Sequence, residues 1–415
     1  MQQVLVAPGL KFARRRLDWK VIGLVGVAHA SSHFFQLVIP SLFAPLAAEF
    51  GLGFAELGVL VAVFYAISGI GQASSGFVVD RAGARPVLWF GLSCFVVAGA
   101  LLGAAPSYGW LLAAAVVAGV GNSVFHPVDF SILNRRVSTP RLGHAFSAHG
   151  ITGNLGWATT PVFITTLTHL FNWRVAAFGA GLLVAIILAL TIAGRRLLAV
   201  DLVRTPGRSR RTTASPAASG TSLGALLVNP VVWGAFLFFM FSSIAISAVQ
   251  NYTLPILTAT YGISSVAAST ALSGYMVAGA AGMVLGGFLV SSGPHSERIV
   301  GMSFVAAGML LALLAMGWLP AIAAVPCVAL AGLCAGVAGP SRDMLVRRVT
   351  PRGATGSVYG LVYSGMDTGS AVAPLAFGVM LDAGLRQGPY LGAFLAFLLA
   401  AFFAALIAAR ARRVH

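Results

Sequence analysis

Residues 174–196 read RVAAFGAGLLVAIILALTIAGRR, an apolar run with arginine at both ends. A helix needs ~20 predominantly apolar residues to cross the hydrocarbon core of a bilayer, and this run is long enough. The terminal arginines would reach the headgroup level, as basic side chains near the ends of membrane helices do. The stretch therefore predicts a membrane-spanning helix, and similar runs recur along the chain.

The composition of the whole chain agrees with a membrane setting. Of 415 residues, 58% are hydrophobic and 9% are charged, whereas a soluble domain carries roughly 25% charged residues. Most of the surface must therefore face lipid. The 49 glycines and 19 prolines fit packed membrane helices, whose backbones approach at small residues. The three cysteines lie in apolar runs and indicate neither a disulfide framework nor a metal site.

Twelve apolar runs are long enough to span a bilayer. They cover about 19–47, 54–79, 87–104, 109–134, 144–168, 174–194, 226–258, 265–290, 298–318, 321–346, 354–380 and 388–409. The first run is far longer than the apolar region of a signal peptide, so we interpret it as an uncleaved helix.

The basic residues predict the orientation of these spans. With the N-terminus in the cytoplasm, all but three of the 26 lysines and arginines lie in cytoplasmic segments; Arg174 and Arg386 lie in outer loops and Arg342 lies inside a span. This bias is typical of inner-membrane proteins and predicts that both termini are cytoplasmic. It also accounts for the net charge of +16 through anionic lipid headgroups, without a nucleic-acid partner.

The two halves of the chain resemble each other at an offset of about 213 residues. Pro127 matches Pro340, Asn154 matches Asp367 and Pro161 matches Pro374. We therefore expect an all-α integral membrane protein with twelve transmembrane helices in two pseudo-symmetric six-helix bundles. The predicted domains are residues 1–196 and 225–415, joined by a polar cytoplasmic linker over 197–224.

The loop between the second and third spans reads GFVVDRAGAR over residues 76–85. It resembles the signature loop of the major facilitator superfamily, which usually has another basic residue where Ala84 stands. In that interpretation Asp80, Arg81 and Arg85 are gating residues that pin neighbouring helix ends in one transport state. The alternative is a plain basic turn. The matching loop of the second half has Ser291 in place of the acid.

A longer stretch, residues 118–163, resembles the fosmidomycin-resistance branch of that superfamily. The resemblance is carried by VFHP at 124–127, by Gly153-Asn154 with Gly156 and Pro161, and more faintly by His29 and Gln36. It implies a proton-driven carrier, often an exporter of toxic compounds such as a small phosphonate. The chain departs from the branch at Ser32-His33, where Asn-Asp is usual, and an acid at Asp367 is not implied.

Titratable residues inside the spans are candidates for proton coupling, because charge within a membrane is costly. Asp367 lies halfway along its span and could carry a proton, or could make a helix-packing hydrogen bond as its counterpart Asn154 could. His29 and His33 are four residues apart and share a helix face. Either imidazole could carry a proton or bind an anion, or could instead bond a neighbouring helix carbonyl.

Asp129 and Arg342 occupy equivalent positions of the two halves, nearer the cytoplasmic end. A bond between them would close an inner gate. Alternatively, Asp129 stabilises the Asp80–Arg81 loop and Arg342 pairs with the gating candidate Asp343. A permanent guanidinium beside a cavity would also attract carboxylate or phosphonate.

The residues predicted to bind substrate are polar positions within the spans, each of which could instead serve packing. They are His29, His33, Gln36, His126, His149, Asn154, Arg342 and Tyr363. Their basic side chains outnumber the central acid Asp367, which favours an anionic substrate.

We therefore predict a proton-coupled secondary transporter that exports a small anionic organic compound by alternating access. Import of a small organic acid by proton symport is the alternative, and a transport-dead membrane sensor is a further one. We expect no enzymatic activity, no cofactor and no metal, because neither a nucleotide-binding motif nor a catalytic constellation is present. The expected partners are the solute, protons and lipid, and the expected state is a monomer.

Overall fold

A computed structural model describes residues 8–199, 230–291, 296–349 and 355–414. The described residues are almost entirely helical and include no strand. The helices of the first half are α1 (Pro8–Gln36), α2 (Val38–Ser41), α3 (Phe43–Phe50), α4 (Phe54–Ala82), α5 (Ala84–Gly103), α6 (Tyr108–Asn122), α7 (Phe125–Arg136), α8 (Leu142–Leu170) and α9 (Trp173–Ala193). Those of the second half are α11 (Pro230–Tyr261), α12 (Ser265–Ser291), α13 (Ser296–Ala315), α14 (Ala321–Val349), α15 (Thr355–Asp382) and α16 (Gly388–Val414).

These helices make the twelve predicted spans, because α1 to α3 together form the first and α6 with α7 forms the fourth. In the described part of the chain, nine helical stretches are long and apolar enough to cross a membrane by composition alone. Polar side chains lower the hydropathy of the three other long helices, α1, α8 and α15. These three helices carry His29, His149 and Asp367, which are candidate site residues.

Two spans are broken where a single run was predicted. The first span is divided at Leu37 and Leu42, and Pro40 lies within the short helix α2 between them. The fourth span breaks at Ser123 and Val124, just before the pair His126-Pro127. A proline in the first turn of α7 is tolerated there because backbone N–H groups of a first turn have no partner within the helix.

The internal repeat predicted from sequence appears in the helix bounds. Adding 213 to the first and last residues of the α6–α7 span, Tyr108 and Arg136, gives 321 and 349, the bounds of α14. The same addition carries Leu142 at the start of α8 onto residue 355, where α15 begins. The two halves therefore repeat one six-helix plan.

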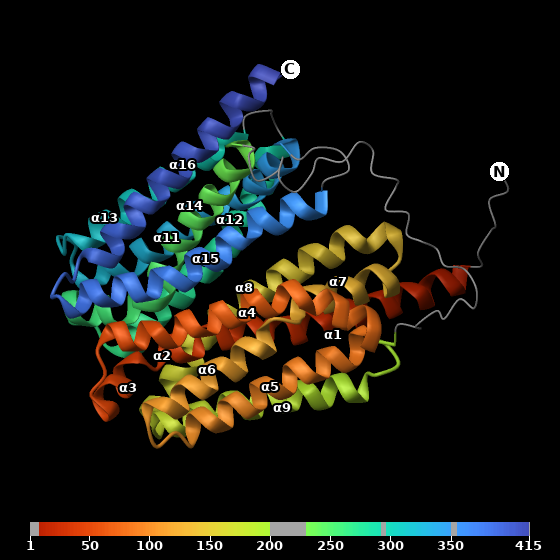
Figure 1. Cartoon of the computed structure of the whole chain (residues 1–415), viewed down its shortest axis with the longest axis horizontal. Coiled ribbons are helices and arrows are strands. Elements are labelled where there is room, and N and C mark those ends of the chain that lie inside the picture. The colour runs from red at the N-terminus through yellow and green to blue at the C-terminus, as the bar shows by residue number, and fades with distance from the viewer. Residues whose placement is uncertain (1–7, 200–229, 292–295, 350–354, 415) are drawn as a thin grey trace.

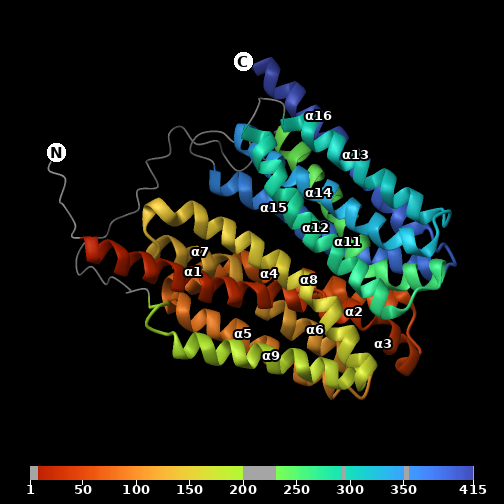
Figure 2. The same cartoon turned by 180° about the vertical axis from the view of Figure 1, so that it is seen from behind.

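The chain forms two bundles, α1 to α9 and α11 to α16, which lie side by side (Figure 1). Between them, α4 packs against α15 and α8 packs against α12. The ribbons of the two bundles meet near α2 and α3 and separate toward the end at which α1 begins, as both views show (Figures 1 and 2). The described residues of α4 and α15 thus contact each other mainly toward one end.

Backbone contact between the bundles depends on glycine. A Cβ at Gly58 of α4 would lie 2.4 Å from the carbonyl oxygen of Pro374 on α15. A Cβ at Gly378 of α15 would lie 2.3 Å from the carbonyl oxygen of Phe54 on α4. Because such distances are too short for any side chain, these glycines allow the two helices to touch.

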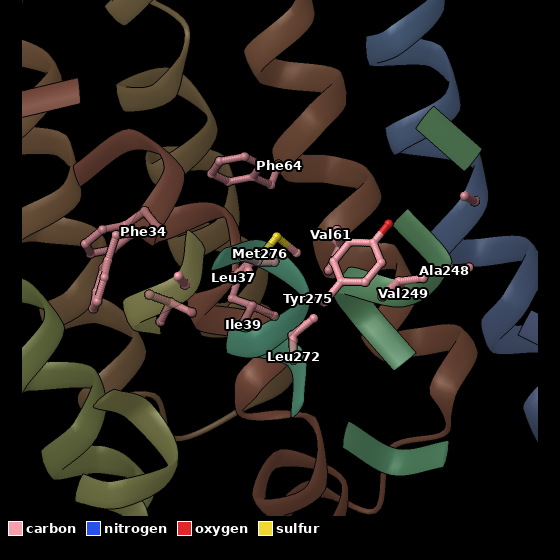
Figure 3. Packing of buried hydrophobic residues seen from close by; sticks show 14 of the residues in the cluster. Phe34, Leu37, Ile39, Val61, Phe64, Ala248, Val249, Leu272, Tyr275 and Met276 are labelled. Atoms are coloured by element: carbon pink, nitrogen blue, oxygen red, sulfur yellow. The ribbon is translucent and has the colours of Figure 1, made fainter. Parts of the chain in front are cut away.

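Apolar side chains fill the joint between the bundles where they meet. Leu37, Ile39 and Val61 of the first bundle belong to one buried cluster with residues of the second (Figure 3). Those residues are Ala248, Val249, Leu272, Tyr275 and Met276, from α11 and α12. These side chains pack the two bundles against each other.

The predicted domain boundaries stay a prediction. The linker was placed over residues 197–224, of which 200–224 lie outside the described residues. Its first residues continue the first bundle, since Leu198 is buried and the Arg136 Nε donates to the Leu197 carbonyl at 3.0 Å.

Candidate functional site

Three helices of the first bundle bring four histidines and one carboxylate together. His29 and His33 come from α1, His126 comes from α7 and His149 comes from α8. The ring of His29 lies at the centre, with centroids 4.7 Å from His33, 5.5 Å from His126 and 3.5 Å from His149. We call these four residues, together with Asp129, the histidine cluster.

Asp129 is the acid of this cluster and is fully buried. Its Oδ2 atom lies 3.1 Å from His149 Nε2, a hydrogen bond, and 2.9 Å from His29 Nδ1. The His29 contact does not count as a hydrogen bond, since His29 Nδ1 has no hydrogen-bond partner among the described residues. Asp129 therefore contacts histidines of its own bundle and not the Asp80–Arg81 loop, on which one interpretation of the sequence had placed it.

The stacking of His29 on His149 restricts the charge that the pair can carry. Their rings are 3.5 Å apart and nearly parallel, with 24° between their planes. Two imidazolium rings at that distance would repel each other strongly, although one positive charge would be offset by Asp129.

Glycines of α8 make room for the cluster. A Cβ at Gly153 would lie 3.1 Å from His33 Nε2 and 3.2 Å from His29 Nε2. A Cβ at Gly156 would lie 2.3 Å from the carbonyl oxygen of Ala30. These two residues belong to the Gly153-Asn154 motif that carried the branch resemblance, so the motif allows α1 and its histidines to pack against α8.

A second polar network lies next to the histidine cluster. Asn122 Oδ1 accepts hydrogen bonds from Ser32 Oγ at 2.7 Å and from Gln36 Nε2 at 3.2 Å. Asn122 also donates to Ser68 Oγ at 2.7 Å, and Gln36 Oε1 accepts from Trp157 Nε1 at 2.8 Å. The network holds α1, α4, α6 and α8 in register. Sequence reasoning missed Ser32, Ser68 and Trp157, since only their packing reveals them.

Asp367 of the second bundle faces the first bundle. A Cβ at Gly69 of α4 would lie 3.2 Å from the Asp367 Cβ. Among the described residues, Asp367 has no ion-pair partner. Its counterpart Asn154 lies at the symmetric joint, where its Nδ2 atom contacts the Met283 sulfur of α12 at 3.5 Å. Both members of this repeated pair therefore lie where the bundles meet.

The predicted gating residues lie at the end where the ribbons separate. Asp80 and Arg81 are exposed at the end of α4, and within the described structure no carboxylate or cation pairs with them. The turn that follows uses Gly83, with φ of +87°. Arg85 Nη1 donates to the Arg195 carbonyl at 3.4 Å. Among the described residues the predicted latch therefore has no ion-pair partner, and its role stays a prediction.

Three predicted site residues have side chains outside the described residues. Arg342 and Asp343 belong to α14, and Tyr363 belongs to α15. Their helices are placed, and no contact of their side chains is described.

The structure adds an acid that sequence reasoning missed. Asp382, at the end of α15, accepts hydrogen bonds from the backbone N–H groups of Phe54 at 2.7 Å and Ala55 at 2.8 Å. The carboxylate therefore caps the N-terminus of α4 from the opposite bundle, where the helix dipole favours negative charge.

Two further acids outside the spans hold the first bundle together. The Ser138 hydroxyl and Arg141 both donate to Asp18, and although burial opposes the effect, these bonds lower the pKa of Asp18. Glu49 accepts from Trp173 Nε1 and from Arg174; the Trp173 bond contributes most to lowering the pKa of Glu49.

The chain belongs to the Major Facilitator Superfamily, whose family model matches residues 25–329 and 241–415. This membership confirms the superfamily resemblance and identifies the chain as a transporter rather than an enzyme.

Among its relatives, the fosmidomycin resistance protein of Escherichia coli K12 is 27% identical over 303 residues, covering 72% of this chain and 70% of the relative. The probable nitrate/nitrite transporter NarK2 of Mycobacterium tuberculosis H37Rv is 25% identical over 348 residues, covering 83% and 85% of the two chains. The crystal structure of a bacterial homologue of the human lysosomal transporter Spinster, inward-facing and unoccupied, has the same fold, with a TM-score of 0.70 at 16% identity over 95% of this chain and 96% of that one.

Proposed function

We propose that this transporter is proton-coupled and exports a small anionic organic compound by alternating access. The observation that carries the proposal is the placement of Asp367 at the joint between the bundles, without an ion-pair partner among the described residues. A carboxylate at this joint changes its surroundings whenever the bundles rock, so it can take up a proton in one state and release it in the other.

The anionic substrate is supported by the balance of charge near the joint. The histidine cluster contributes four imidazoles against the single acid Asp129, and Arg342 adds a permanent positive charge to α14. Imidazole and guanidinium groups donate hydrogen bonds to carboxylate or phosphonate oxygens. The relatives named for fosmidomycin resistance and for nitrate or nitrite also support this class.

The direction of transport rests on the fosmidomycin resistance relative. In the proposed orientation the separated ends of the bundles face the cytoplasm, so the described conformation would receive a solute from inside the cell. Asp80 and Arg81 would then pair with the neighbouring bundle only in the opposite state, when these ends close.

The experiment measures intracellular fosmidomycin in cells that express the protein, compared with an empty vector, with and without an uncoupler. Lower accumulation that the uncoupler reverses is the expected result. Higher accumulation would replace export by import of small organic anions, and unchanged accumulation would remove this substrate.

A further inference from the structure

We infer that His29, His33 and His126 form a binding site for a divalent transition-metal ion such as Zn²⁺. One ligand nitrogen from each of these residues lies within 4.8 Å of those from the other two. Neutral imidazole is a preferred ligand of zinc, copper and nickel ions. Three histidines with an open fourth position is an arrangement that zinc adopts in proteins. The inference does not depend on the proposed proton coupling or on the direction of transport.

His33 supplies the first independent argument. Both of its ring nitrogens are shielded from solvent, and neither has a hydrogen-bond partner among the described residues. Buried polar atoms are nearly always paired, because an unpaired one costs folding free energy. Its ring is held in place by Trp157, whose centroid lies 4.2 Å away at 61°. A metal ion between the three rings would supply the missing partner for one of these nitrogens.

His126 is oriented as a metal ligand. Its Nδ1 atom lies 3.2 Å from Gln72 Oε1. An amide oxygen only accepts hydrogen bonds, so the hydrogen of the neutral ring must be on Nδ1. The lone pair is then on Nε2. A metal-binding histidine typically donates its other N–H to an oxygen in this way, which fixes the ring and makes it a better ligand.

His29 has a carboxylate behind it, which lowers the electrostatic cost of a nearby cation. Its Nδ1 atom lies 2.9 Å from Asp129 Oδ2, and its Nε2 atom faces the space at Gly153 that His33 Nε2 also faces. The negative charge of Asp129 would partly balance a divalent ion held by three neutral rings.

A second triad consists of His29, Asp129 and His149, whose ligand atoms also lie within 4.8 Å of one another. All three of its residues are buried, and Asp129 Oδ2 already accepts the hydrogen bond from His149. His33 and His126 are partly exposed as residues, although the ring nitrogens of His33 are shielded, so the first triad lies nearer to solvent than the second. We therefore assign the ion to the first triad and treat Asp129 and His149 as positioning residues behind it.

The test is equilibrium binding of Co²⁺ to the purified full-length protein, prepared without a polyhistidine tag. Calorimetry gives the stoichiometry, and the visible absorption of bound Co²⁺ reports its coordination. We expect one Co²⁺ per chain, displaced by Zn²⁺. His33→Gln and His126→Gln should abolish this binding, whereas the matched controls His144→Gln and His169→Gln, both exposed on α8, should retain it.

Gln72→Ala provides a variant that keeps every ligand. Loss of an outer-shell partner should weaken Co²⁺ binding by about 10- to 100-fold. If a histidine variant does not purify as a monodisperse protein, this variant tests the metal site in its place.

The inference is overturned if wild-type protein shows no saturable binding, or if His33→Gln and His126→Gln bind like wild type. Binding lost in His149→Gln but kept in His33→Gln would assign the ion to the second triad instead. The experiment measures metal binding and not transport. A protein that binds no Co²⁺ would therefore leave the transport proposal unaffected, and a protein that transports no fosmidomycin would leave this inference unaffected.

Discussion

Replacing Asp382 by alanine should shift the protein away from the described conformation. Asp382 accepts two backbone hydrogen bonds at the start of α4, and it does so from the opposite bundle. Loss of a helix N-cap typically costs about 0.5–2 kcal/mol. Because the bond exists only while the ends of α4 and α15 touch, the cost applies to this conformation alone. A change of one to two kcal/mol corresponds to about a 5- to 30-fold change in the ratio of two states.

The shift can be measured as a distance distribution between spin labels. Labels on cysteines introduced at Ala82 and Arg298 report on the ends of α4 and α13, in a background where Cys94, Cys327 and Cys334 are replaced. We expect a shorter distance to become more populated in Asp382→Ala, as the separated ends close.

Glu56→Ala is the matched control for this experiment. Glu56 Oε2 accepts at 2.9 Å from the N–H of Gly53, the N-cap residue of α4. Its loss therefore weakens the same helix end without affecting a contact between the bundles. An unchanged distribution in Asp382→Ala, or an equal shift in Glu56→Ala, would refute the reasoning.

Three further predictions follow from contacts in the structure. Gly58→Ala should also disfavour the described conformation, because its Cβ would lie 2.4 Å from the Pro374 carbonyl oxygen; Gly23→Ala, whose Cβ meets no atom within 4 Å, should leave the label distances unchanged. Asn122→Leu should destabilise the protein by about 2 kcal/mol or more, because Ser32 and Ser68 lose buried partners; an unchanged thermal unfolding temperature would contradict this. Asp18→Asn should lower the unfolding temperature at neutral pH. Folding depresses the pKa of Asp18 below its usual value of about 3.9. The contribution of the Asp18 carboxylate to stability is therefore present above that pH and is lost as the pH falls through the folded-state pKa. The difference from wild type should therefore shrink below about pH 4, and a constant difference would exclude the charge as its cause.

Much of the fold follows from the sequence because every span must be apolar and long enough to cross the lipid. Runs of ~20 apolar residues predicted all twelve helices, and matching residues such as Pro127 and Pro340 predicted the repeat. The breaks in the first and fourth spans were not predicted, because hydropathy is insensitive to a short interruption of the backbone.

The candidate site was predicted only in part. The spacing of His29 and His33 along one helix indicates a shared face. Their proximity to Asp129 depends on how α1, α7 and α8 pack, which no local pattern encodes. For the same reason the spacing along the chain predicts no metal site, although the fold brings three imidazoles together. Asp382 was missed because its partners are backbone groups of another bundle.

The most direct test of the account uses purified protein in proteoliposomes with an imposed pH gradient, comparing wild type with Asp367→Asn. We predict that wild-type protein drives fosmidomycin against its concentration gradient. The variant should lose this proton-driven movement yet still exchange labelled for unlabelled solute, because asparagine cannot carry the proton but keeps the shape of the side chain. Proton-driven transport that survives Asp367→Asn intact would contradict the central claim and would make His33 the leading candidate for proton coupling.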